Sequence, residues 1–174
     1  MSTICFIGAG NMAQSIMGGL IQSGTPANNI WATARTESKL SQLKQNYDIN
    51  VTSNNVAAVE ASRIVVLAVK PQMMSGVCEQ IAPYIKGKLV ISVAAGLSCA
   101  SLENWLGNDT PIIRCMPNTP SLVGAGASGL YANPNVNMLQ RQAGEAILGA
   151  TGTTCWVDDE DHMHAVTAVS GSGP

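Results

Sequence analysis

Short apolar runs alternate with segments of helical periodicity along nearly the whole chain. The runs rich in Ile, Val and Leu predict buried strands at residues 3–7, 30–34, 49–52, 64–69, 89–93, 112–116, 128–131 and 153–157. Apolar residues spaced three or four apart predict the intervening helices: Met12, Ile16 and Leu20 in the first, Leu40 and Leu43 in 37–46, a short helix at 54–61, Leu102, Trp105 and Leu106 in the fifth, and Val136, Leu139, Ala143 and Ile147 in the last.

Local stop and start signals agree with this reading. Gly24 is placed to end the first helix, and Ser98 to cap the fifth. Pro71 opens another helix at a position where its missing N–H has no cost. Four consecutive acidic residues, 158–161, suit the first turn of a new helix, because the helix dipole favours negative charge there.

The alternation predicts the fold class. The run 64–69 is apolar on both faces, as a central parallel strand must be when helices cover both sides of a sheet. Repeated strand–helix units with short connections predict right-handed crossovers. We therefore expect an α/β protein of the Rossmann type, with a doubly wound, mainly parallel sheet and helices on both faces.

Composition narrows the possible partners and compartment. Hydrophobic residues make up 46% and charged residues 11% of the chain, which indicates a well-buried core. The formal net charge of −2, without a basic stripe, argues against nucleic acid or an anionic membrane surface as a partner. The first apolar run is too short for a signal peptide or a membrane span. Five cysteines without a CxxC motif, at 5, 78, 99, 115 and 155, predict buried free thiols and a cytoplasmic location.

A glycine motif follows the first predicted strand and opens the first helix. The stretch from Gly8 to Ala13 matches G-x-G-x-x-G/A. Gly8 permits the tight turn, Gly10 lets the backbone approach a pyrophosphate, and Ala13 is small enough for close packing of helix on strand. The free N–H groups of the helix start supply an anion site. The alternative to a binding motif is a tight strand-to-helix turn that merely favours small residues. Because the motif lies at the first strand–helix junction of an alternating chain, it indicates dinucleotide binding.

The end of the second predicted strand indicates which dinucleotide binds. An NAD-binding chain usually has an acidic residue there, to accept a hydrogen bond from the ribose 2′-hydroxyl. Arg35 stands in that place, and a guanidinium pairs with a 2′-phosphate, with Thr33 and Thr36 as possible additional hydroxyls. NADP is therefore favoured over NAD. In the alternative, Arg35 is a solvated loop residue and Glu37 is the ribose ligand.

Further candidates follow the later strands, because ligands of such sheets lie beyond the carboxyl ends of the strands. Lys70 follows the fourth strand, and is either an anion contact or a solvated lysine. The proline-bracketed loop 116–120 follows the sixth. His162 and His164 are two residues apart and make a poor metal pair, so no metal site is expected. No general acid, base or nucleophile is evident, which suggests that the hydride chemistry of a cofactor dominates.

Five motifs in this order resemble pyrroline-5-carboxylate reductase, the last enzyme of proline biosynthesis. They are GAGNMA at 8–13, AVKPQ at 68–72, AAG at 94–96, MPNTP at 116–120 and SGSGP at 170–174, and the resemblance covers the whole chain. The family reduces the C=N bond of 1-pyrroline-5-carboxylate to L-proline with NADPH or NADH. The alternatives are a non-catalytic NADP-binding sensor, or a related 3-hydroxy-acid dehydrogenase or imine reductase.

The resemblance also implies site residues. Contacts to the cofactor would come from Ile7, Gly8, Ala9, Gly10, Asn11, Met12, Ala34, Arg35, Asn55, Ala68, Val69, Lys70, Pro71, Val93, Ala94 and Ala95. Met116, Asn118 and Thr119 would form the loop where nicotinamide and pyrroline meet. No catalytic residue is assigned.

The same resemblance implies a domain division. Residues 1–157 would form the dinucleotide-binding domain, and 158–174 would begin a helical C-terminal domain that joins two subunits and builds much of the substrate site. On this reading the 174-residue chain binds NADPH but has almost no activity by itself. A natural Gly/Ser tail is the alternative for 170–174, although it would leave the apolar run before it exposed.

Overall fold

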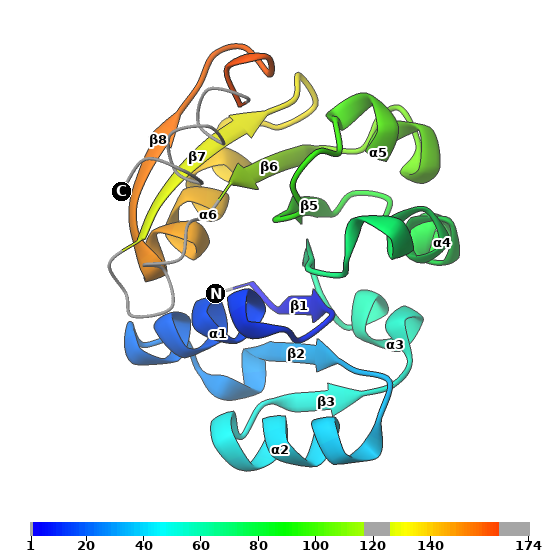
Figure 1. The fold of residues 1–174 in the computed structure, drawn as a ribbon, viewed down its shortest axis with the longest axis vertical. Helices are drawn as coiled ribbons and strands as arrows, with labels where there is room; N and C mark the ends of the chain where they lie inside the picture. The colour runs from blue at the N-terminus through cyan, green and yellow to red at the C-terminus, as the bar shows by residue number, and fades with distance from the viewer. Residues whose placement is uncertain (1, 117–125, 164–174) are drawn as a thin grey trace.

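One eight-stranded sheet organises the protein. The computed structural model describes residues 2–116 and 126–163 (Figure 1). Asn118, Thr119, His164 and residues 170–174 lie outside the described part. The strands follow one another in space as β3-β2-β1-β4-β5-β6-β7-β8. Their bounds are β1 Ile4–Ile7, β2 Ile30–Thr33, β3 Asn50–Thr52, β4 Ile64–Leu67, β5 Leu89–Ser92, β6 Ile112–Met116, β7 Gly126–Ala132 and β8 Gly152–Trp156.

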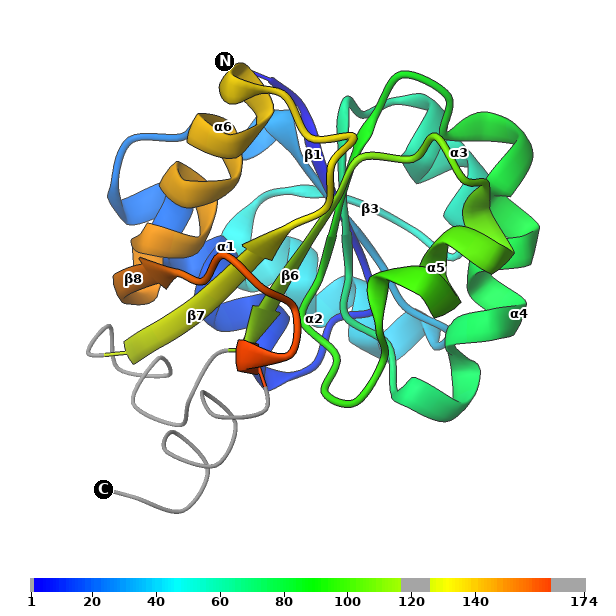
Figure 2. The same cartoon turned by 90° about the horizontal axis from the view of Figure 1, so that it is seen from above.

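Helices cover both faces of this sheet (Figure 2). Their bounds are α1 Asn11–Gln22, α2 Glu37–Tyr47, α3 Asn55–Glu60, α4 Pro71–Ile81, α5 Cys99–Leu106 and α6 Met138–Leu148, with short 3-10 turns at Ala27–Asn29, Ala82–Tyr84 and Gly149–Thr151. Residues of α1, α2 and α6 share one apolar cluster, whereas α3, α4 and α5 pack into the other. The doubly wound arrangement expected from the sequence is confirmed.

The sheet is mainly parallel. Strands β3, β2, β1, β4, β5 and β6 run in one direction, so their carboxyl ends meet along one edge. β7 pairs with β6 in the antiparallel sense and β8 pairs with β7 in parallel. Every residue of β4 is buried, as its apolar sequence predicted. The edge shared by the carboxyl ends is where a ligand site is expected.

The start of helix α6 differs from what its apolar pattern suggested. Ile147 is buried in the core, but Leu139 is 76% and Met138 is 67% exposed. Asn137 caps the helix and is joined to Gln140 by reciprocal hydrogen bonds, so Met138 and Leu139 belong to an exposed first turn. Periodicity predicted the helix correctly, but Leu139 does not belong to its buried face.

The acidic run 158–161 lies before a helix rather than in its first turn. These residues form a bend and turn, and helical geometry begins at His162. The Asp159 carboxylate accepts a hydrogen bond from the Asp161 amide at 2.9 Å, and the Asp159 carbonyl accepts one from the His162 amide at 3.0 Å. The Glu160 carboxylate instead contacts residues far away in the sequence, Arg114 on β6 and the amide of Cys99 at the start of α5.

Four of the five cysteines are buried free thiols, and one is not. Cys5, Cys78, Cys99 and Cys115 are buried, whereas Cys155 on the edge strand β8 is exposed. The expectation of buried thiols is therefore wrong for Cys155. Its neighbours on β8 alternate between half-buried and exposed, because successive side chains of a strand point to opposite faces of the sheet.

We expect the buried thiols to lower stability at alkaline pH. Burial raises the pKa of the Cys5 and Cys115 thiols to about 12. In the unfolded chain a thiol loses its proton near pH 8.5, so above that pH the folded state binds more protons than the unfolded state. The free energy of unfolding should fall by up to about 1.4 kcal/mol per thiol for each pH unit between roughly 9 and 12.

Urea unfolding from pH 7 to 10.5 measures this dependence. Cys115→Ala should give a shallower decline of the unfolding free energy with pH than the unchanged chain. Cys155→Ala, which removes the exposed thiol, should leave the slope as it is. Identical slopes for Cys115→Ala and the unchanged chain would contradict the prediction.

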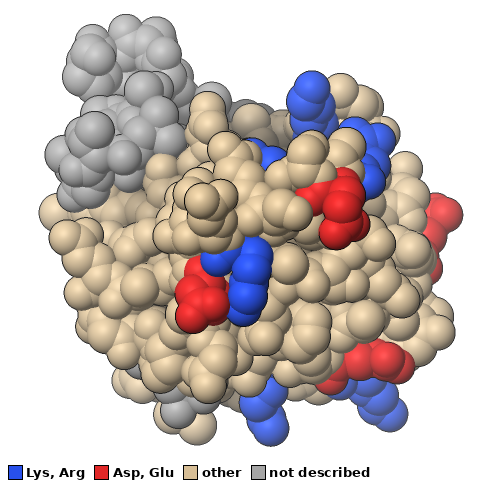
Figure 3. Space-filling model, turned by 90° about the horizontal axis from the view of Figure 1, so that it is seen from below, with Lys and Arg blue, Asp and Glu red and all other residues tan. Residues whose placement is uncertain are grey.

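Charges are sparse on the surface. Figure 3 shows Lys, Arg, Asp and Glu side chains on one face as single residues or small groups in a largely uncharged surface. Nowhere in the described part of the chain is there a helix with the length and apolar character needed to cross a membrane.

Candidate dinucleotide site

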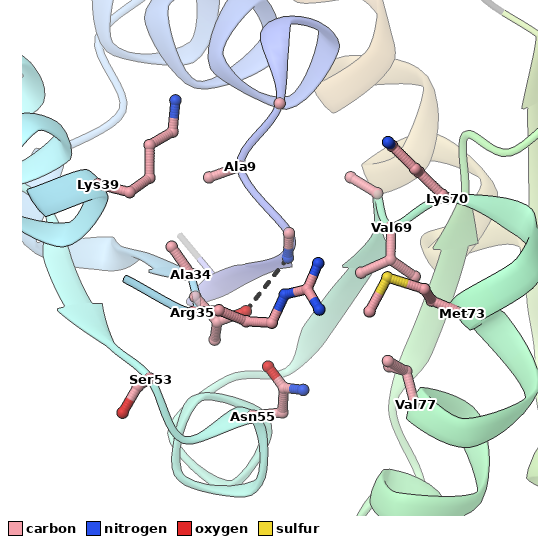
Figure 4. Close-up of a pocket in the computed structure, with 14 residues that line it drawn as sticks. Ala9, Ala34, Arg35, Lys39, Ser53, Asn55, Val69, Lys70, Met73 and Val77 are labelled. Carbon is pink, nitrogen blue, oxygen red and sulfur yellow. Dashed lines mark hydrogen bonds between the residues drawn. The ribbon is translucent and has the colours of Figure 1, made fainter. Parts of the chain in front are cut away.

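A cavity of roughly 370 Å³ opens at the carboxyl ends of β1, β2 and β4 (Figure 4). Its volume lies within the range of small-molecule sites. The residues that line it are Gly8, Ala9, Gly10, Thr33, Ala34, Arg35, Lys39, Ser53, Asn55, Ala68, Val69, Lys70, Met73 and Val77. Segments separated by up to about 70 residues in the sequence thus converge here because the strands are parallel.

The turn after β1 needs glycine at its first position. Gly8 has φ +95°, and a Cβ there would lie 2.9 Å from the Ala68 carbonyl oxygen. The Gly8 amide donates a hydrogen bond of 3.2 Å to the Thr33 hydroxyl, shown as the dashed line in Figure 4. Thr33 is almost fully buried. The turn therefore packs closely against the backbone that follows β4 and is hydrogen-bonded to the last residue of β2.

Two helices begin at the cavity without a side-chain cap. In the described part of the chain, α2, α3, α5 and α6 are capped by Thr36, Asn54, Ser98 and Asn137, which accept backbone N–H groups. Gly10 and Lys70 precede α1 and α4 and form no such bond. A Cβ on Gly10 would meet nothing within 4 Å. The free amides and the open space above Gly10 suit an anionic group.

The cavity is cationic. Arg35, Lys39 and Lys70 line it, and the described lining residues include no carboxylate. In Figure 4 the Arg35 side chain extends from the end of β2 towards Val69 and Met73 on the opposite wall, with Asn55 below it. Glu37, the alternative ribose ligand, lies instead in a neighbouring hollow with Leu40 and Lys44. This arrangement favours Arg35 over Glu37 as the residue after β2 that contacts the ribose of a dinucleotide or its 2′-phosphate.

Nine of the sixteen predicted cofactor residues lie in this cavity: Gly8, Ala9, Gly10, Ala34, Arg35, Asn55, Ala68, Val69 and Lys70. Ile7 is fully buried as the last residue of β1. Asn11, Met12 and Pro71 belong to the first turns of α1 and α4 but are not lining residues. Val93, Ala94, Ala95 and Met116 lie at the ends of β5 and β6, along the same sheet edge but outside the cavity. The contacts of all sixteen residues with a cofactor stay predictions.

The cavity also contains residues that the sequence reasoning missed. Lys39, two residues into α2, brings a second cation close to Arg35. Its position in the first helical turn was a usable signal, because a cation there opposes the helix dipole and calls for an anion nearby. Met73 and Val77 add an apolar wall one helical turn apart on α4. The oxygens of Thr33 and Thr36, the possible additional hydroxyls, accept hydrogen bonds from the Gly8 and Lys39 amides. Each hydroxyl keeps its hydrogen to donate, so a contact with a phosphate stays a prediction.

Comparisons with known proteins agree with this geometry. Over its whole length the chain is 50% identical to a pyrroline-5-carboxylate reductase of Pseudomonas aeruginosa, of which it covers 65%. A solved pyrroline-5-carboxylate reductase of Coxiella burnetii superposes with a TM-score of 0.97 at 43% identity, over 99% of this chain and 65% of that one. The reductase of Plasmodium falciparum, solved with NADP bound, gives a TM-score of 0.88 at 30% identity, over 99% of this chain and 63% of that one.

The resemblance found in the five motifs is thereby confirmed. The chain spans 65% of the length of the Pseudomonas aeruginosa relative, and 63% of that of a Vibrio alginolyticus reductase. A family model described as NADP oxidoreductase coenzyme F420-dependent matches residues 3–96. These residues contain the glycine turn and all the lining of the cavity. The chain belongs to this family of NADP oxidoreductases.

Proposed function

We propose that this chain is the cofactor-binding portion of an enzyme that reduces 1-pyrroline-5-carboxylate to L-proline with NADPH. The observation that carries the proposal is the cavity itself. It combines a glycine turn, two uncapped helix starts and three cations, in a chain similar over its whole length to pyrroline-5-carboxylate reductases. NADPH carries three phosphates, which is the charge pattern that such a cavity would select.

The residues present fit the cofactor. The amides at the start of α1 would hold the pyrophosphate, with Gly10 leaving room for it. Arg35 and Lys39 would pair with the adenosine 2′-phosphate, which favours NADPH over NADH. Asn55 lies on the adenosine side, and Val69, Met73 and Val77 would give the adenine ring an apolar wall.

The remaining predicted residues would serve the reacting end. NADPH supplies a hydride, which adds to the C=N carbon of the imine. Val93, Ala94 and Ala95 would line the path to the nicotinamide, and Met116, Asn118 and Thr119 would contact the pyrroline. Because a protonated imine is already electrophilic, the protein mainly has to hold the two reactants close and in the right orientation.

The proposed domain division and assembly follow from the same reasoning. β8 ends at Trp156, and the Val157 amide still bonds to the Leu130 carbonyl of β7 at 2.8 Å. We place the end of the dinucleotide-binding domain at residue 157 and the start of a helical, subunit-joining domain in 158–174. The buried reduced thiols Cys5, Cys78, Cys99 and Cys115 support a cytoplasmic location.

Two measurements test the proposal. NADPH titrated into the chain should bind with a rise in nicotinamide fluorescence. A chimera that joins the chain to the segment that follows its aligned region in the Pseudomonas aeruginosa relative should form proline from 1-pyrroline-5-carboxylate and NADPH. The same chimera carrying Arg35→Asp is the matched control, expected to need far more NADPH. NADPH binding without any imine reduction by the chimera would instead favour a non-catalytic binding protein.

A further inference from the structure

A buried arginine lies in the middle of β6, outside the cavity. Arg114 is on β6, with its side chain only 8% exposed. It pairs in register with Ser92, the last residue of β5, on one side and with Tyr131 of β7 on the other. The arginine is therefore level with the point where β5 ends and the segment that starts with Val93 begins.

Its ionic partner comes from a distant segment. The Glu160 carboxylate lies 3.7 Å from the Arg114 Nη1 atom. The same carboxylate oxygen accepts a hydrogen bond of 3.0 Å from the amide of Cys99, the first residue of α5. Figure 2 shows the segment after β8 passing across β7. One carboxylate thus joins the end of β6, the start of α5 and the segment after β8.

Stability does not explain this pair well. Two charges removed from water lose hydration that their mutual attraction only partly restores, and apolar residues of similar volume often stabilise a protein as much or more. Within the described part of the chain, the Arg114 Nε atom has no hydrogen-bond partner, so the arginine is not fully satisfied either. Such pairs are best attested where they select one arrangement of neighbouring segments.

We propose that Arg114 and Glu160 are positioning residues for the nicotinamide half of the cofactor site, a proposal that rests on the function proposed above. Their ion pair holds the segment after β5, the end of β6 and the segment after β8 in one arrangement. Val93, Ala94 and Ala95, predicted to line the path to the nicotinamide, follow β5, the strand beside Arg114. Met116, predicted for the loop where nicotinamide and pyrroline meet, is the last residue of β6, the strand that carries Arg114. The cavity for the adenosine half is built from β1, β2 and β4 and does not depend on the pair.

The test compares two ligands. NADPH occupies both halves of the site, whereas 2′-phospho-ADP-ribose lacks the nicotinamide. Glu160→Gln retains an oxygen that accepts from the Cys99 amide but removes the charge that Arg114 faces. We expect it to weaken NADPH binding by about threefold to thirtyfold. The affinity for 2′-phospho-ADP-ribose should stay within about twofold, which also shows that the variant is folded.

Two further variants complete the design. Arg114→Lys keeps the positive charge without the planar guanidinium and should weaken NADPH selectively, by a smaller factor. Asp158→Asn removes one charge from an exposed position in the same acidic run and should change neither affinity. Equal losses for both ligands, or no loss for either, in Glu160→Gln and Arg114→Lys would overturn the inference. Failure of the unchanged chain to bind 2′-phospho-ADP-ribose would overturn the proposed function, and this inference with it.

Discussion

Arg35→Asp should weaken NADPH binding by about a hundredfold and change NADH binding by less than about threefold. A charge-assisted hydrogen bond contributes about 1.5–3 kcal/mol, and each 1.4 kcal/mol is a tenfold change in affinity. The substituted carboxylate also repels the 2′-phosphate. NADH has a hydroxyl at that position, so the carboxylate even offers it a hydrogen-bond acceptor. Fluorescence titration with both cofactors measures the two affinities.

Arg63→Asp is the matched control for this substitution. Arg63 is exposed and precedes β4, at the edge of the sheet opposite to the cavity. The substitution changes the net charge by the same amount as Arg35→Asp, but far from the proposed cofactor site. It should leave both affinities almost unchanged. Lys39→Ala should reduce NADPH affinity alone, by less than Arg35→Asp does. Equal losses of NADPH and NADH affinity in Arg35→Asp would show that Arg35 does not contact the 2′-phosphate.

Gly8→Ala should lower the free energy of unfolding by about 2–5 kcal/mol and abolish cofactor binding. The φ of +95° costs an L-residue about 1–2 kcal/mol. In addition, the new methyl group would lie 2.9 Å from the Ala68 carbonyl oxygen and 3.0 Å from its carbonyl carbon, which are backbone atoms of a neighbouring segment. Overpacking of this kind costs about 1–3 kcal/mol. Urea unfolding with and without NADPH measures both effects.

Gly10→Ala is the control, because it separates binding from stability. Its φ of −74° suits any residue, and a Cβ there would have no neighbour within 4 Å. We expect a loss of about 0.5–1 kcal/mol in unfolding free energy, because Ala is a poorer N-cap residue than Gly. A clear loss of cofactor affinity should accompany it, since the methyl group occupies the space of the pyrophosphate. A stability loss as large as that of Gly8→Ala would contradict the assignment of the two glycines.

Periodicity and stop signals were enough to predict the order of strands and helices. β4 ends two residues before the predicted end of its strand, and α5 is capped by Ser98 as predicted, because their signals are local: an unbroken apolar run and a serine before a helix. Leu139 was misjudged for the opposite reason. Whether an apolar residue in the first turn of a helix reaches the core depends on how far that helix extends beyond the sheet.

Many residues of the candidate site could also be predicted from the sequence, because local signals mark their positions. Residues next to the glycine turn or at the end of a strand can be placed from topology alone, as with Gly8, Arg35 and Val69. Contacts between a side chain and a backbone group far away in the sequence cannot be placed from topology alone. The bond from Glu160 to the Cys99 amide spans 61 positions, and no local pattern in the acidic run distinguishes Glu160 from its neighbours.

The hydrogen bond from the Gly8 amide to the Thr33 hydroxyl has a consequence for attempts to change the cofactor preference. Thr33 is the last residue of β2, immediately before the residues that would discriminate between the two cofactors. A library that randomises the whole strand end would remove this hydroxyl in most of its members and leave the partly buried Gly8 amide without it, at a cost of about 0.5–1.5 kcal/mol. Variation confined to positions 34–39, with Thr33 and the capping Thr36 retained, would search for NADH preference without disturbing the phosphate turn.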